Sequence, residues 1–258
     1  SNAAFFSLFG YAAQGHPDQA QLTANNNAFG LAYGTVRVGP NITIDRLNQG
    51  GNYNVSEHAV LWVDGGSVTK PSGTGEAVVV YGKIKVSNGT FTSNAPSGIT
   101  SRLNGVFEST GGTTVISQFR TSVFGTQHIG GYIQTGGNVT IIGTAASTDY
   151  YSFNLSYEGN VFSLTGGTLT INGTNSKGAI FINSDPVNVN VSANANMNLI
   201  ATNATPFRIT SKAPLPTVTL SRSGAGAREF VLVGGLVGTN PSNQAELPAL
   251  PLVTRGSL

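Results

Sequence analysis

The sequence predicts an all-β fold, a right-handed parallel β-helix in which about 23–25 residues make one coil and caps cover the two ends. Three observations support this fold class. Turn pairs of small residues recur at a nearly constant spacing, short segments of alternating apolar and polar residues lie between them, and equivalent offsets from the turns carry similar side chains.

A pair of turn residues, most often Gly-Gly or Asn-Gly, marks one corner of each repeat. Its second residue is Gly66, Gly89, Gly112, Gly137 and Gly167 in turn, and these positions differ by 23, 23, 25 and 30. Another turn precedes most of these pairs, as at Tyr81-Gly82 and Asn104-Gly105. Glycine and asparagine suit such corners because they tolerate positive φ. Each repeat therefore predicts strand, tight turn, short strand, glycine turn, strand and longer loop.

Large apolar side chains occupy the same offsets from the corners in successive repeats. Five residues before each glycine lie Leu61, Ile84, Phe107, Tyr132 and Phe162. Two residues after it, in four of the repeats, lie Val68, Phe91, Val139 and Leu169. Since side chains alternate along a strand, we expect both sets to point inward and to stack coil upon coil. Burying each is worth roughly 1.5–3 kcal/mol, which only stacked neighbours can provide.

Two repeats depart from this pattern. The segment 113–115 is expected to be out of step by one residue. The repeat between Thr168 and Thr217 is expected to place its strand at 187–191, in a longer alternating run that bends near Ser192. A β-sandwich or jelly roll is the alternative fold, because it also has short strands and frequent turns. It would not predict equivalent residues at a fixed interval, so the β-helix is favoured.

The β-helix is expected to span residues 35–233, with a different kind of segment on either side. Residues 1–34 are interpreted as a tag scar and an N-terminal cap, with a short helix over 16–22 that has proline at its first position. Residues 234–258 carry several prolines and are interpreted as a C-terminal cap or a linker. Caps are expected because bare strand edges invite aggregation.

Composition narrows the classes of function. Charged residues make up 9% of the chain and the net charge is +2, so a nucleic-acid partner is not expected. The absence of cysteine excludes a disulfide framework, and no apolar run approaches the roughly 20 residues of a membrane span. Abundant Gly, Asn, Thr and Ser with few charges resembles the composition of exported bacterial proteins. An extracellular or cell-surface location is therefore expected.

The period of about 23–25 residues with three short strands per coil resembles the right-handed parallel β-helix of the pectate-lyase type. The chain also resembles the large repetitive, adhesin-like surface proteins of Gram-negative bacteria. The resemblance to the pectate-lyase type rests on the period and the corner residues between about 35 and 233. The two resemblances imply one module of a larger bacterial surface or secreted protein.

One outward offset predicts a candidate ligand-binding group. Four residues before the corner glycine lie Trp62, Lys85 and Glu108, one in each of three consecutive coils. Adjacent strands are about 4.8 Å apart, so these side chains should be neighbours on one face. The single tryptophan beside a charged pair is a candidate platform for a sugar ring. A surface ladder stabilised by cation–π and ionic contacts is the alternative.

A second outward file is rich in hydroxyl groups. It contains Thr69, Thr92, Thr140, Thr170 and Thr219. Such a flat threonine array resembles the ice-facing surface of β-solenoid antifreeze proteins, which implies ice binding as a candidate function. The alternative is that threonine simply favours exposed strand positions.

An enzyme is the competing class of function. Polysaccharide lyases and hydrolases that share the resembled fold use acids clustered on one outer face, often with calcium. Here the next coil has Ser87, not an acid, at the position equivalent to Asp64. Asp45 and Glu57 are close to Asp64 in sequence and could gather with it near basic residues, but their spacing does not require this. Metal-ligand spacing is also absent from the three histidines, His16, His58 and His128.

The sequence therefore predicts a non-catalytic extracellular β-helix module that contacts a polysaccharide or a cell-surface glycan. No catalytic residue, metal or cofactor is assigned, and the oligomeric state stays open. A polysaccharide lyase or glycoside hydrolase is the alternative function. A structural spacer or an ice-binding solenoid is the third.

Overall fold

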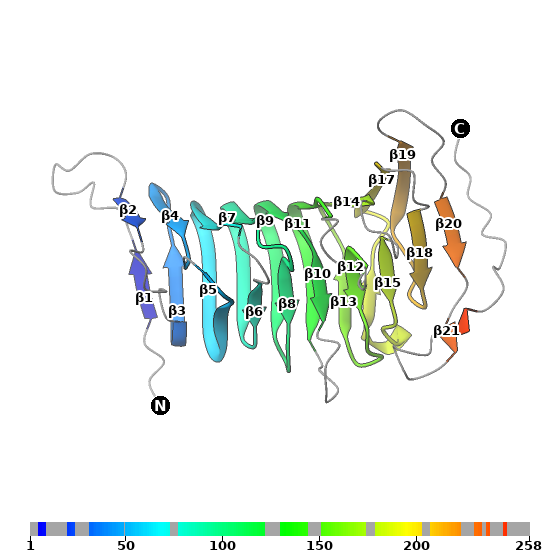
Figure 1. The fold of residues 1–258 in the computed structure, drawn as a ribbon, viewed down its shortest axis with the longest axis horizontal. Coiled ribbons are helices and arrows are strands. Elements are labelled where there is room, and N and C mark those ends of the chain that lie inside the picture. The colour runs from blue at the N-terminus through cyan, green and yellow to red at the C-terminus, as the bar shows by residue number, and fades with distance from the viewer. Residues whose placement is uncertain are drawn as a thin grey trace.

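A computed structural model of the chain describes residues 5–8, 20–23, 31–48, 50–72, 77–121, 130–143, 151–173, 179–202, 207–222, 230–233, 236–237 and 245–246. The described residues form a parallel β-solenoid of about seven turns, which confirms the predicted fold class. Figure 1 shows the coils stacked side by side along the long axis of the molecule. Within these ranges, the strand pairing that is not parallel joins β21 (Leu236–Val237) to β22 (Ala245–Glu246).

Three parallel ladders, here called ladders I, II and III, run along the solenoid. Ladder I joins β1 (Phe5–Leu8), β3 (Leu31–Val38), the middle of β5 (Tyr53–Lys70), the first halves of β7 (Lys83–Ser93), β9 (Val106–Ile116) and β11 (Gly131–Ile141), then β13 (Val161–Leu164) and β16 (Val189–Val191). A short 3-10 turn, η2 (Pro186–Asn188), precedes β16.

The other two ladders complete the cross-section of each coil. Ladder II joins β2 (Ala20–Thr23), β4 (Ile42–Arg46), the second halves of β5, β7, β9 and β11, then β14 (Thr168–Gly173), β17 (Asn196–Ala201) and β19 (Thr217–Arg222). Ladder III joins the start of β5 to β6 (Val78–Val80), β8 (Ile99–Ser101), β10 (Phe119–Thr121), β12 (Phe153–Leu155), β15 (Ile180–Ile182), β18 (Phe207–Ser211) and β20 (Phe230–Val233).

The predicted inward files form the core. In ladder I, Phe107 pairs in parallel register with Ile84 on one side and with Tyr132 on the other. The full set is buried: Leu61, Ile84, Phe107, Tyr132 and Phe162 in ladder I, and Val68, Phe91, Val139 and Leu169 in ladder II. Successive coils therefore superpose equivalent residues, as the spacing of the corner glycines predicts.

The segment 113–115 corrects one expectation, because it stays in step with its neighbours. Thr113 pairs with Thr90 and Asn138, so Thr114 takes the inward position and is fully buried. Its Oγ1 has no hydrogen-bond partner within the described part of the chain. The backbone ladder holds the register here, and the interior accepts a threonine whose hydroxyl is buried.

The strand expected at 187–191 is also placed differently. Residues Val189–Val191 form β16, which pairs with β13 in ladder I. The ladder II strand of that coil is β17, which lies between β14 and β19. A turn follows Ser192, where a bend was expected. Because the alternation continues through this turn, the period alone does not show which half of the run belongs to ladder II.

The helix expected over 16–22 is wrong at its C-terminal end. Residues Ala20–Thr23 form β2, which pairs in parallel with β4. Residues 9–19 lie outside the described residues, as does most of the segment 234–258. The proline at the first position indicated a helix, but the parallel edge offered by β4 favours an extended strand.

Candidate functional site

The outer face of ladder I brings together the predicted ligand-binding group. Trp62 pairs with Lys85, and Lys85 pairs with Glu108, on β5, β7 and β9. The Nζ atom of Lys85 lies 5.1 Å from the centroid of the indole ring, and the guanidinium carbon of Arg37 lies 4.9 Å from it. Arg37 comes from β3 and Lys85 from β7, so cations from both neighbouring coils lie over the indole. A sugar that stacks on a face of Trp62 covered by a cation must displace that cation.

Glu108 joins this row of side chains to a second lysine. Its Oε2 lies 2.7 Å from the Nζ atom of Lys83, and its Oε1 lies 3.8 Å from that of Lys85. Both lysines are partly exposed, so each pair contributes about 0.2–1 kcal/mol. The pairing compensates both lysine charges in part and orders the side chains across two coils.

Asp64 lies at the centre of a hydrogen-bond network at the end of this row. Trp62 Nε1 donates to Ser87 Oγ over 2.7 Å, and Ser87 Oγ donates to Asp64 Oδ1 over 2.7 Å. Arg37 Nε donates to Asp64 Oδ2 over 2.7 Å. The pKa of Asp64 lies below its ordinary value of 3.8. The hydrogen bond from Ser87 makes the largest contribution to this lowering, and the interactions with Arg37 make smaller ones. The network therefore links three successive coils through one carboxylate.

Replacing Asp64 with asparagine is expected to weaken the pH dependence of stability. A carboxyl group with a lowered folded-state pKa stabilises the fold above its unfolded-state value, and the contribution disappears as the pH falls through the folded-state value. The difference in unfolding free energy between wild type and Asp64→Asn should therefore be largest at neutral pH and shrink below 3.8. Urea unfolding across acidic pH measures this difference, with Glu57→Gln as the control. A difference that grows on acidification would contradict the assignment.

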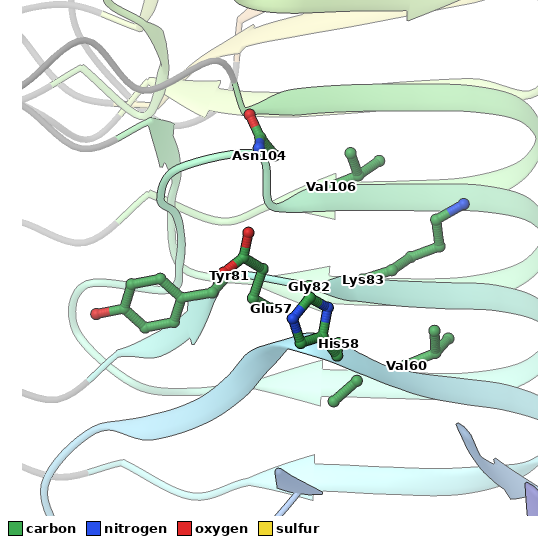
Figure 2. Close-up of a pocket in the computed structure, with 9 residues that line it drawn as sticks. Glu57, His58, Val60, Tyr81, Gly82, Lys83, Asn104 and Val106 are labelled. Atoms are coloured by element: carbon green, nitrogen blue, oxygen red, sulfur yellow. The ribbon is translucent and has the colours of Figure 1, made fainter. Parts of the chain in front are cut away.

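An open depression of about 470 Å³ adjoins the row, where β5, β7 and β9 enter ladder I. Its polar lining comes from Glu57, His58, Tyr81, Lys83 and Asn104, and its apolar lining includes Val60 and Val106. Figure 2 shows Glu57 and His58 near the middle, with Tyr81 on one side and Lys83 on the other. The depression therefore offers a carboxylate, an imidazole, a phenol, an ammonium and an amide within one open site.

Some side chains that line the depression contact other residues of the protein, whereas others are exposed to solvent. The imidazole of His58 stacks on Tyr33 with 5.6 Å between ring centroids, and the Tyr81 hydroxyl accepts a hydrogen bond from Arg102 Nη1 over 3.3 Å. Lys83 is paired with Glu108. Glu57 is exposed, and it takes part in no ion pair among the described residues. Glu57, His58 and Asn104 thus present polar groups to solvent.

The sequence predicted the row but not the depression beside it. In the sequence, His58 is considered as a possible metal ligand, and Tyr81 and Asn104 are considered only as parts of turns. A usable signal existed, since these residues belong to the turns that precede the corner glycines in consecutive coils. Residues at equivalent corners lie side by side in a solenoid, so polar and aromatic side chains there form a common surface.

The hydroxyl file lies in register on the outer face of ladder II. Thr69 pairs with Thr92, and Thr140 pairs with Thr170. Val115 lies between Thr92 and Thr140, and Asn198 lies between Thr170 and Thr219. The face is uncharged along these coils, but its threonines are interrupted twice.

No group of three His, Asp or Glu side chains in the described ranges is arranged to hold a metal ion. Among those same residues, no helix has the length and apolarity that crossing a membrane requires. Comparisons with protein-family models, with curated proteins and with solved structures find no match to this chain.

Proposed function

We propose that this chain is a non-catalytic β-helix module that contacts a polysaccharide or a cell-surface glycan. The contact is made through the depression and the adjoining row of Trp62, Lys85 and Glu108. The observation that carries the proposal is the combination of hydrogen-bonding side chains with aromatic rings in one open site. Sugars are recognised by such a combination, because ring faces offer apolar surface while hydroxyl groups need directed partners. Open access on the outer face suits a long polymer.

We further infer that the solenoid is of the pectate-lyase-like type and acts outside the cell, as part of a larger bacterial surface or secreted protein. Val60, Lys83, Val106 and Gly131 are equivalent in ladder I, and their positions differ by 23, 23 and 25. Each of these coils contributes to three ladders. The low charge and the richness in Gly, Asn, Thr and Ser support the location. Glycan contact on a long rigid module is the role expected of an adhesin-like surface protein.

Glycan binding is tested with a glycan array and with soluble polysaccharides titrated against the purified chain. Tyr81→Ala removes a ring from the depression and Trp62→Ala removes the indole of the row, so each is expected to weaken binding about tenfold, or about 1.4 kcal/mol. Thr92→Ala on the other outer face is the matched control and should bind as wild type. Equal binding by all four proteins, or none by wild type, would contradict the proposal.

The same samples separate the other functions. Release of products from a polysaccharide by wild type, lost in Glu57→Gln or Asp64→Asn, would favour a lyase or hydrolase. Inhibition of ice recrystallisation that is lost in Thr140→Tyr would favour ice binding by the hydroxyl file. Absence of all these activities would leave a structural spacer.

A further inference from the structure

The turn Asn88-Gly89 differs from the corners stacked on either side of it. The residue before the corner glycine is itself glycine in the neighbouring coils, at Gly65, Gly111, Gly136 and Gly166. Among the coils that have a corner glycine, this one carries asparagine before it, and Asn88 is exposed. In an asparagine followed by glycine, the backbone nitrogen of the glycine can attack the side-chain carbonyl carbon of the asparagine most easily. Glycine has no side chain to hinder this approach.

The backbone nitrogen of Gly89 lies next to the side chain that it would attack. It donates a hydrogen bond to the Oδ1 atom of Asn88 over 2.9 Å. Gly89 also lies between the paired segments of β7, because its neighbours Asn88 and Thr90 pair with β5 while Gly89 itself has no partner in the register. In the described register Gly89 is paired with neither β5 nor β9, and its nitrogen is hydrogen-bonded to the Asn88 side chain.

Two other Asn-Gly pairs are held differently. The nitrogen of Gly105 donates to the carbonyl oxygen of Arg102 over 2.8 Å, which engages it in a turn. Gly173 lies inside β14 and pairs with Ala201 of β17. In both cases attack first requires an existing backbone arrangement to open, which costs free energy.

We propose that Asn88 is a site of spontaneous deamidation in the folded protein. The Gly89 nitrogen gives up its proton to solvent base and forms a bond to Asn88 Cγ. The bond from Cγ to Nδ2 then breaks, and the Nδ2 group takes up a proton from solvent and leaves as ammonia. The product is a cyclic succinimide. Water then opens the ring at one of its two carbonyl carbons, which yields aspartate or isoaspartate at position 88. No oxidant or reductant takes part.

The isoaspartate product does not fit the stacked corner. A Cβ atom at Gly89 would lie 2.1 Å from the carbonyl oxygen of Gly66, so the corners of successive coils pack backbone against backbone. Isoaspartate lengthens the main chain by one carbon at this point. Either product also places a new carboxylate opposite Asp64, which pairs with Asn88 in the register. The modification therefore loosens the contact between the β5 and β7 coils.

Peptide mass analysis of the folded protein, aged in mildly alkaline buffer, tests the proposal. Tryptic cleavage places Asn88, Asn104 and Asn172 in separate peptides, so each Asn-Gly pair is followed independently. We expect Asn88 to be converted about tenfold faster than the other two in the folded state, and all three at similar rates in urea. Conversion of Asn104 or Asn172 as fast as Asn88 in the folded protein, or no conversion of Asn88, would overturn the proposal.

The repeat itself supplies the matched variant. Asn88→Gly reproduces the corner of the neighbouring coils, so it should fold as wild type and keep its stability through the same ageing. Asn88→Asp imitates one product without lengthening the backbone. Wild type should lose stability on ageing in proportion to its isoaspartate content, measured with an isoaspartate-specific methyltransferase. Equal loss in Asn88→Gly would refute the structural consequence.

Discussion

Replacing Phe107 with alanine is expected to lower the free energy of unfolding by about 3–5 kcal/mol, the range for truncating a buried phenylalanine. Phe107 is fully buried, and its ring lies 5.5 Å from that of Tyr132 and 6.2 Å from that of Phe119 between centroids. Loss of the ring would leave a cavity between the aromatic side chains that ladders I and III contribute from adjoining coils. Backbone pairing on both sides of β9 prevents the coil from collapsing into the space.

Chemical unfolding followed by circular dichroism measures this loss. Phe107→Leu keeps most of the apolar volume and should fall between wild type and Phe107→Ala. Thr92→Ala, on an outward position of ladder II, is the surface control and should change the free energy by no more than about 0.5 kcal/mol. If Phe107→Ala costs no more than Thr92→Ala, the stacked core would be contradicted.

The architecture was predictable because one short-range signal repeats. Corner glycines set the offset, and the alternation of strand side chains then assigns each residue to the inside or the outside. The pairing of Trp62 with Lys85 and of Lys85 with Glu108 follows from that offset alone. The signal weakened where a coil replaced a large apolar residue by threonine at position 114, and where one alternating run supplied strands to two ladders.

The spacing of the repeat does not predict properties that depend on side-chain conformation. Spacing places Trp62 and Lys85 in one row, but it predicts neither that Arg37 lies beside them nor that both cations lie over the indole ring. The depression arises where corners differ in length, because four residues separate Val55 from Val60 while two separate Val80 from Lys83. An offset counted from the glycines treats such corners as equal, so it misses the hollow that their difference creates.

Substituting alanine for a corner glycine should show how tightly the coils are stacked, and the chain contains a matched pair for the measurement. Gly137 has φ of +73° and Gly51 has φ of +72°, so alanine at either site takes on the same left-handed backbone. A Cβ atom at Gly137 would lie 2.5 Å from the carbonyl oxygen of Gly111 in the preceding coil, whereas one at Gly51 would have nothing within 4 Å. The left-handed conformation costs about 1–2 kcal/mol at both positions.

Gly137→Ala should therefore destabilise the protein by more than Gly51→Ala, by about a further 1–3 kcal/mol, the usual cost of overpacking. The excess isolates the contact between coils, because the φ penalty cancels when the two variants are compared. Urea unfolding of both variants gives the difference directly. Nearest-neighbour contacts stabilise a solenoid, so damage at one corner should also weaken the coils next to it. Equal destabilisation by the two variants would mean that the corners do not pack backbone against backbone, and the register of the ladders would then rest on the side chains alone.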